Sequence, residues 1–102
     1  MGVMNNSSSP LQTHDKLGAA VKVGTRVRVI EIASSVFEPL APAETVRVQS
    51  MLGEVFSVYE VDQWGRAWVE KWWSEGEEHS TSHSLALEPE EMEVVSENDA
   101  NV

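Results

Sequence analysis

Two strand-like runs on either side of a short loop constrain the fold of this chain more than any other part of its sequence. Residues 54–61 and 66–73 are rich in β-branched and aromatic side chains, and residues 62–65, which end in Gly65, separate them. Runs of this kind around a short loop with a terminal glycine are typical of a β-hairpin. The sequence therefore predicts an antiparallel hairpin with residues 62–65 as its loop.

The rest of the chain adds short strands, and helix is expected to be nearly absent. β-Branched residues at nearly every second position predict a first strand over residues 21–32, with a bulge or bend at Ile30. Two prolines make residues 33–43 a long loop. The remaining segments are, in chain order, a short extended piece at residues 45–51, a strand at 83–87, a tight turn at 89–91 and a strand at 92–95.

These segments predict one domain with a loose segment at each end. Residues 1–20 and 96–102 are polar and lack sustained periodicity, so we expect a disordered leader and a disordered tail. Residues 21–95 hold every aromatic side chain, including the 4 tryptophans, which supply apolar area for a single core. Five short strands with a long first loop predict an all-β fold, a small five-stranded barrel.

A pattern of glycines and valines runs along the predicted strands. It comprises residues 23–29, residues 53–55 at the start of the hairpin, and residues 83–87 and 91–95 near the end. This pattern resembles the SH3-like barrels, which include the variable chain of ferredoxin-thioredoxin reductase, the photosystem subunit that docks ferredoxin, the barrel of the nitrile hydratase β subunit and ribosomal KOW-type domains. The resemblance implies a non-catalytic accessory or assembly subunit of an enzyme complex, with a KOW-like nucleic-acid-binding module as the alternative.

Both faces of the predicted hairpin are apolar. With residues 62–65 as the loop, Tyr59 stands opposite Trp68 and Val55 stands opposite Trp72, all on one face. The other face carries Phe56, Val58, Ala67, Val69 and Trp73, of which we expect Phe56, Val58 and Val69 to point inward. Because a barrel hairpin normally turns a polar face to water, something must cover the second apolar face.

The face with Val55, Tyr59, Trp68 and Trp72 has two interpretations. In the structural one, the long first loop or the leader folds over these side chains. In the functional one, they form an exposed patch that docks a partner protein or a second copy, because tryptophan and tyrosine are typical interface anchors. Trp64 is a candidate for the same contact, since loop tips often carry recognition residues, although a single exposed aromatic is also ordinary.

The chain is acidic, and its charge is unevenly distributed. It has 17 acidic and 7 basic side chains, and residues 75–102 hold nine of the acids and none of the bases. A negative surface repels nucleic-acid phosphates and anionic membranes, which favours basic protein partners or none. The structural interpretation of these acids is a solvated surface that keeps the protein soluble. The acids that could form a rim for such a partner are Glu75, Glu77, Glu78, Glu88, Glu90, Glu91 and Glu93. The nucleic-acid alternative would use Arg26, Arg28, Arg47 and Arg66.

The sequence predicts a cytoplasmic protein that does not enter a membrane. No apolar run approaches the roughly 20 residues of a membrane span, and the first residues lack the pattern of a secretory signal. The chain has no cysteine, so it carries neither a disulfide nor a thiolate metal site.

The sequence contains no side-chain constellation that predicts catalysis, a cofactor or a metal. Its serines and threonines lack a plausible general base, and its 6 glycines are dispersed and form no phosphate loop. His79 and His83 are four residues apart, which in an extended strand separates them by roughly 13 Å, too far for ligands about 2 Å from one metal ion. His14 lies in the expected leader. We therefore expect a non-enzymatic protein that docks a partner through its aromatic hairpin face.

Overall fold

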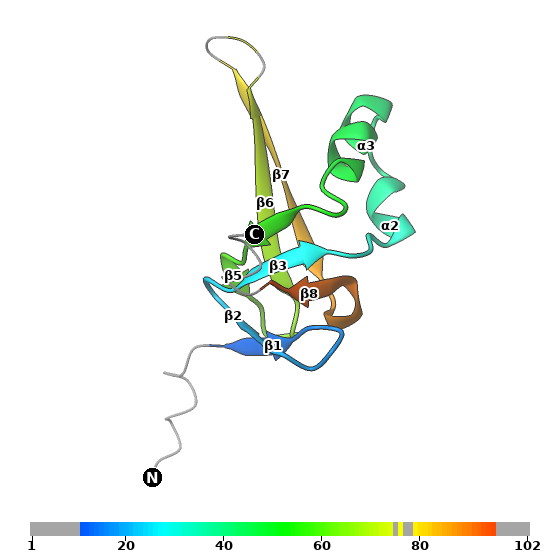
Figure 1. Ribbon diagram of the computed structural model, residues 1–102. Coiled ribbons are helices and arrows are strands. Elements are labelled where there is room, and N and C mark those ends of the chain that lie inside the picture. The colour runs from blue at the N-terminus through cyan, green and yellow to red at the C-terminus, as the bar shows by residue number, and fades with distance from the viewer. Residues whose placement is uncertain (1–10, 75, 77–78, 96–102) are drawn as a thin grey trace.

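The structure is a computed structural model that describes residues 11–74, 76 and 79–95. Within these residues, most of the regular structure is strand, arranged in three antiparallel sheets (Figure 1). The strands are β1 (Gln12–His14), β2 (Ala20–Lys22), β3 (Arg26–Val29), β4 (Val55–Ser57), β5 (Glu60–Val61), β6 (Ala67–Ser74), β7 (Ser80–Leu87) and β8 (Met92–Val94). The helical segments are α2 (Ser34–Phe37), α3 (Pro42–Gln49) and the 3-10 turn η1 (Pro89–Glu91). The prediction of an all-β fold is confirmed at this level.

The prediction of a closed five-stranded barrel is wrong. β1 pairs with β2, β3 lies between β4 and β8, and β6 lies between β5 and β7, so none of the described sheets closes on itself. Residues 54–61, expected as one strand, are divided between two sheets, because β4 joins β3 whereas β5 joins β6. A chain that changes sheets in this way connects them at a corner instead of continuing one ladder.

The expected first strand over residues 21–32 is two strands separated by a turn. Gly24 has a φ of +95°, a conformation that residues with a side chain rarely adopt. Thr25 N–H donates to the Lys22 carbonyl at 3.0 Å across this turn. The chain therefore turns at Gly24, which the sequence did not predict. β3 also ends before Ile30, where the N–H groups of Ile30 and Glu31 both donate to the Glu91 carbonyl, at 2.8 and 3.3 Å.

Part of the expected leader belongs to a sheet. β1 pairs with β2, and the carboxylate of Asp15, which is 2% exposed, follows β1 directly. It accepts hydrogen bonds from the N–H groups of Leu17 at 2.9 Å, Ala19 at 2.8 Å and Val94 at 2.7 Å. These hydrogen bonds hold the segment in place, although it has few apolar side chains to bury. The first half of the expected leader and the expected tail lie outside the described residues.

Two helices form where the sequence predicted a loop and a short extended segment. α2 lies within the expected loop of residues 33–43, and α3 covers most of residues 45–51. Pro42 starts α3, a position where the backbone N–H that proline lacks would make no hydrogen bond within the helix. Glu44 lies in the first turn, where the helix dipole favours an acidic side chain. Val48 is the buried residue of α3. These signals outweigh the strand preference of the valines. Among the described residues, no helix is long and apolar enough to cross a membrane.

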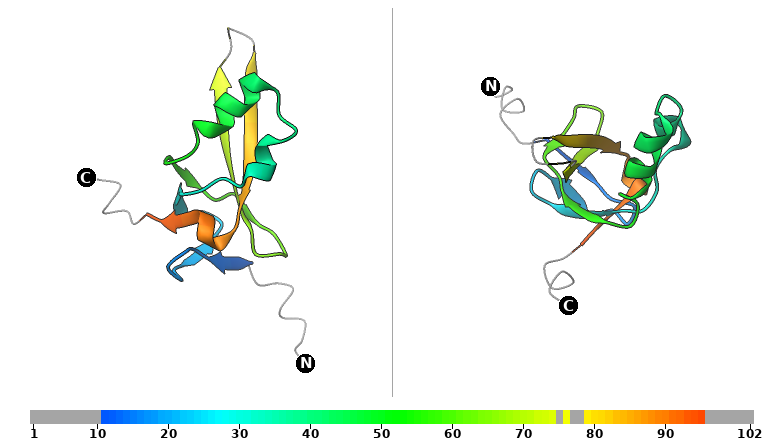
Figure 2. Two further views of the ribbon diagram at one scale, coloured as in Figure 1. Left: turned by 90° about the vertical axis from the view of Figure 1, so that its right-hand side faces the viewer. Right: turned by 90° about the horizontal axis from the view of Figure 1, so that it is seen from above.

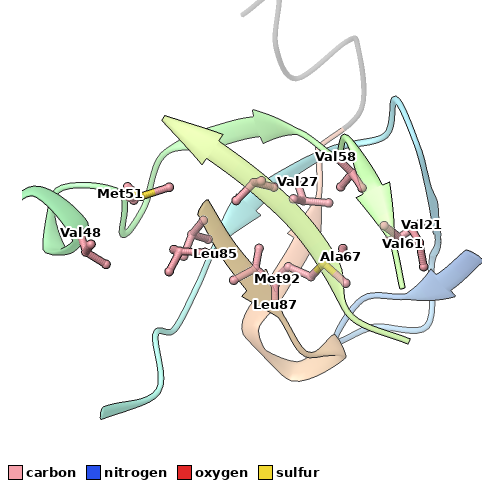
Figure 3. Close-up of a cluster of buried hydrophobic side chains, with 12 residues drawn as sticks. Val21, Val27, Val48, Met51, Val58, Val61, Ala67, Leu85, Leu87 and Met92 are labelled. Atoms are coloured by element: carbon pink, nitrogen blue, oxygen red, sulfur yellow. The ribbon is translucent and has the colours of Figure 1, made fainter. Parts of the chain in front are cut away.

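One apolar core connects the three sheets and α3 (Figure 3). Its buried side chains are Val21, Val27, Val29, Val48, Met51, Val58, Val61, Ala67, Val69, Leu85, Leu87 and Met92. β6 and β7, the longest strands, rise from the remaining strands beside α2 and α3 (Figures 1 and 2). The core therefore takes up one face of the β5–β6–β7 sheet, and the other face points outward.

Candidate docking face

The candidate site lies on the outward face of the β5–β6–β7 sheet. The register pairs Trp68 with Glu60 and Ala67 with Val61, one residue away from the predicted pairing of Tyr59 with Trp68. The predicted pairing of Val55 with Trp72 is also wrong, because Val55 belongs to β4. The cross-strand partner of Val55 is Arg28, in another sheet.

The shift in register arises at the loop, where Asp62 N–H donates to the Arg66 carbonyl at 3.0 Å, and a β-bulge follows at Tyr59. Tyr59 N–H donates to the Trp68 carbonyl at 3.0 Å, while the strand register also pairs Glu60 with Trp68. Two residues therefore stand opposite one, the defining feature of a bulge. Val58 and Val61, on either side of the bulge, are both buried, although strict alternation would put residues three apart on opposite faces.

The predicted inward face is confirmed by burial. Val58 and Val69 belong to the core, and Phe56 is half-buried and packs against it. Trp73 also packs against the core, with the Lys71 ammonium 5.3 Å from the centre of its indole ring. The remaining aromatic residues of the hairpin are therefore those of the outward face and the loop.

The outward face of β6 carries Trp68, Glu70 and Trp72 in succession. Trp72 is 61% exposed, and Trp68 is half-buried. Tyr59, 45% exposed, donates its hydroxyl hydrogen to Ser84 Oγ at 3.0 Å. Because β6 lies between β5 and β7, this bond carries the Tyr59 ring across the outward face of β6. Three aromatic side chains thus occupy one sheet face.

The carboxylate of Asp62 organises the loop at the end of this face. Oδ1 accepts the N–H groups of Trp64 at 3.0 Å and Arg66 at 2.9 Å. Oδ2 accepts Arg66 Nε–H and the Trp68 indole N–H, each at 3.0 Å. Gly65 completes the turn with a φ of +82°. Desolvation alone would raise the pKa of Asp62, but these four hydrogen bonds together lower it to about 2.

The Arg66 guanidinium lies between two indole rings. Its central carbon is 5.4 Å from the ring centre of Trp64 and 5.9 Å from that of Trp68, within the range of cation–π attraction. Trp64 nevertheless remains 69% exposed. The loop therefore holds the indole of Trp64 next to the sheet face, and sequence reasoning, which treated Trp64 as an isolated aromatic, missed this stack. We call Tyr59, Trp64, Trp68 and Trp72 the docking face.

A pocket of about 320 Å³ adjoins Trp68. One wall comes from residues 32–36, at and before α2, and another from β6 and β7 through Trp68 and Ala86. Glu88 and Glu91 line the end near η1. The segment after β3 therefore flanks Trp68, as the structural interpretation anticipated, but it leaves Trp72 exposed.

Charged side chains near the docking face are mostly acidic. Glu60 and Glu70 lie on the same sheet face as Trp68, and the strand register places no lysine or arginine among the described outward residues of β5, β6 and β7. Sequence reasoning assigned the rim to the C-terminal acids and missed Glu60. Of those acids, Glu75, Glu77 and Glu78 lie outside the described residues.

The arginines of the nucleic-acid alternative come from three separate segments of the fold. Arg26 and Arg28 lie on β3, where Glu93 of β8 stands opposite Arg28. Arg66 is paired with Asp62 at 3.0 Å. Arg47 lies on α3.

The three histidines lie on different parts of the described structure. His79 precedes β7, His83 lies within β7 opposite Lys71, and His14 lies in β1. In the described part of the chain, no three histidine or acidic side chains come together as metal ligands would.

Comparison with known proteins finds no family model that matches the sequence and no curated protein or solved structure similar to it. The function is therefore inferred from the docking face itself.

Proposed function

We propose that this protein is a non-catalytic accessory or assembly subunit that binds a basic partner protein through its docking face. The observation that carries the proposal is the exposure of Trp64 and Trp72, at 69% and 61%, beside Tyr59 and Trp68. Large aromatic side chains that remain exposed together on a rigid sheet are typical anchors of protein interfaces.

The Asp62 network favours this role because it fixes the loop before a partner arrives. The carboxylate holds the main chain at Trp64 and the indole of Trp68, and Arg66 is stacked between the two rings. Binding then requires little further ordering of these side chains, which lowers its entropic cost.

The charge around the docking face supports a basic partner. Glu60 and Glu70 share the sheet face with Trp68 and Trp72, and the whole chain has a formal net charge of −10. Complementary charge increases association rates and discriminates against acidic partners. A basic protein surface with apolar residues at its centre would match both the acidic side chains and the exposed aromatic rings of the docking face.

The order of the strands supports a relation to the SH3-like barrels, in an open form. β3 pairs with the last strand, β8, a 3-10 turn precedes β8, and β5, β6 and β7 follow one another in a single sheet. On this proposal the protein serves an enzyme complex in the cytoplasm, as the resemblance of its valine and glycine pattern implies.

The test compares two exposed tryptophans with two exposed aliphatic residues. The full chain captures a basic protein, which is then purified, and its affinity for Trp64→Ala/Trp72→Ala is measured by calorimetry. We expect the affinity to fall at least about tenfold, because interface tryptophans often contribute more than about 1.4 kcal/mol each. The control, Leu17→Ala/Val46→Ala, removes side chains that are 72% and 65% exposed elsewhere and should bind as the wild type does.

Unchanged affinity of a folded Trp64→Ala/Trp72→Ala variant would contradict the proposal. Circular dichroism establishes the fold, which both substitutions should preserve because neither indole is buried. Retention of the wild type on a polyanion column at low salt would instead favour the nucleic-acid alternative.

A further inference from the structure

The pocket beside Trp68 combines apolar walls with an acidic end. Ile32, Val36 and Ala86 provide aliphatic surface, and Trp68 provides an aromatic wall. Its volume of about 320 Å³ is at the lower end of the range for ligand pockets, roughly 300–1,000 Å³. A cavity of this size admits one long side chain and not a folded element.

The acidic end holds Glu91, a residue that is nine-tenths buried. Glu91 is 9% exposed, and its Oε1 accepts the N–H of Glu88 at 2.9 Å. Within the described residues, no other hydrogen bond is made to the Glu91 carboxylate, and no lysine, arginine or histidine pairs with Glu88 or Glu91. The second oxygen of Glu91 therefore has no donor among the described residues, and it is open to solvent, because none of their buried side-chain oxygens lacks a partner.

The surroundings of Glu91 make this carboxylate a strong acceptor for a cation. Burial raises the pKa of Glu91, and the nearby charges of Glu88, Glu90 and Glu31 raise it further. A partly desolvated carboxylate among like charges gains from a positive group that neutralises it. Arg66, the one basic residue among the described residues that line the pocket, is paired with Asp62 at 3.0 Å.

We propose that the pocket receives a lysine or arginine side chain of the basic partner. The aliphatic stem would lie against Trp68, Val36 and Ala86, and the charged head would meet Glu88 and Glu91. Long basic side chains suit such a site because an apolar stem ends in a cation. Trp68 belongs to both the docking face and the pocket, so the two surfaces are continuous. This inference rests on the proposed function, since it names a contact of the same partner.

The test uses small cations that mimic the two side chains. The full chain, labelled with 15N, is titrated with n-butylguanidinium and n-butylammonium chloride, with n-butanol as the neutral control of equal length. We expect saturable shifts at the amides of residues 84–88 and at the Trp68 indole N–H, with dissociation constants on the order of 1 mM, because one side chain makes few contacts. The two cations distinguish an arginine from a lysine site. n-Butanol should produce no saturable shift there.

Glu88→Gln and Glu91→Gln test the acidic end separately. Each should weaken cation binding at least about threefold, because each removes a charge-assisted contact and keeps the shape of the side chain. Glu88→Gln is the safer substitution for the fold, since Glu88 is only half-buried. The control is Glu38→Gln, which removes an exposed charge that does not line the pocket and should bind as the wild type does.

Equal binding of n-butanol and the cations would overturn the inference, and so would an equal loss in Glu38→Gln and Glu88→Gln. Neither result depends on the partner protein. The proposed function could fail in the capture experiment while the pocket binds cations, or survive while the pocket does not, so the two failures are distinguishable.

Discussion

Asp15 and Asp62 each hold a tight segment by accepting several N–H groups. Asp15 joins the turn after β1 to Val94 of β8, and Asp62 joins the hairpin loop to the Trp68 indole. Desolvation tends to raise both pKa values, but the hydrogen bonds outweigh it, and both are lowered. The charged form of each residue is therefore the one that the folded protein favours.

Asp15→Asn should destabilise the protein by about 1–3 kcal/mol, because one of the two acceptor oxygens becomes an NH₂ group that cannot accept. The substitution then leaves without an acceptor either the N–H of Val94 or the N–H groups of Leu17 and Ala19, next to a buried side chain. The free energy of unfolding in urea measures the loss. Glu38→Gln, which removes an exposed charge, should change it little, and equal values for the two variants would contradict this assignment.

The pH dependence of the Trp68 indole N–H should report the ionisation of Asp62. Since the pKa of Asp62 is lowered to about 2, its charged form contributes stability above the ordinary value of 3.8, and this contribution is lost as the pH falls through about 2. The 15N and 1H shifts of the Trp68 indole, followed from pH 5 downward, should therefore keep their neutral-pH values at pH 3.8. A midpoint near 3.8 would show that the carboxylate does not hold the indole.

At the scale of elements, the hairpin and the last strands could be predicted from sequence, but the register and the helices could not. Alternating apolar residues around Gly65 identify two strands, and burial of Val58 and Val69 follows from that alternation. The bulge at Tyr59 leaves no local signal, because it depends on which sheet each half of the strand joins. α3 was missed because its valines favour strands and its one buried residue, Val48, packs in a core formed mostly by residues distant in the sequence.

The helical assignment of residues 42–49 predicts opposite effects for two valines. In a strand, Val46 and Val48 would share a face, whereas in α3 Val48 is 0% exposed and Val46 is 65% exposed. Val48→Ala should therefore cost about 2 kcal/mol of unfolding free energy, and Val46→Ala close to none. Urea denaturation of both variants checks this. Similar losses for both would favour the extended segment that the sequence alone suggested.

At the scale of the whole molecule, three small sheets depend on one core. None of the described sheets closes, yet the strands β2, β3, β5, β6, β7 and β8 and the helix α3 all contribute buried apolar residues to the core. Composition could predict a single core, because the aromatic residues fall in one stretch of the chain. It could not predict which sheet face remains uncovered, since that depends on how residues 32–36 pass beside Trp68.

The docking face and the pocket lie together on this uncovered side. The pocket ends at Glu88 and Glu91, and the sheet face carries Glu60 and Glu70, so a partner would meet aromatic surface flanked by acids. The sequence alone could identify the candidates Tyr59, Trp64, Trp68 and Trp72, because the hairpin has more aromatic residues than its core-facing side needs. Their connection through Asp62 and Arg66 required the folded loop.

The central claim is that a basic partner covers the docking face, and fluorine NMR of the chain labelled with 5-fluorotryptophan tests it most directly. In the free protein, a soluble paramagnetic agent should broaden the resonances of Trp64 and Trp72 more than those of Trp68 and Trp73. Addition of the purified partner should protect Trp64 and Trp72 and leave Trp73 unchanged. Unaltered broadening of Trp64 and Trp72 in the saturated complex would contradict the account.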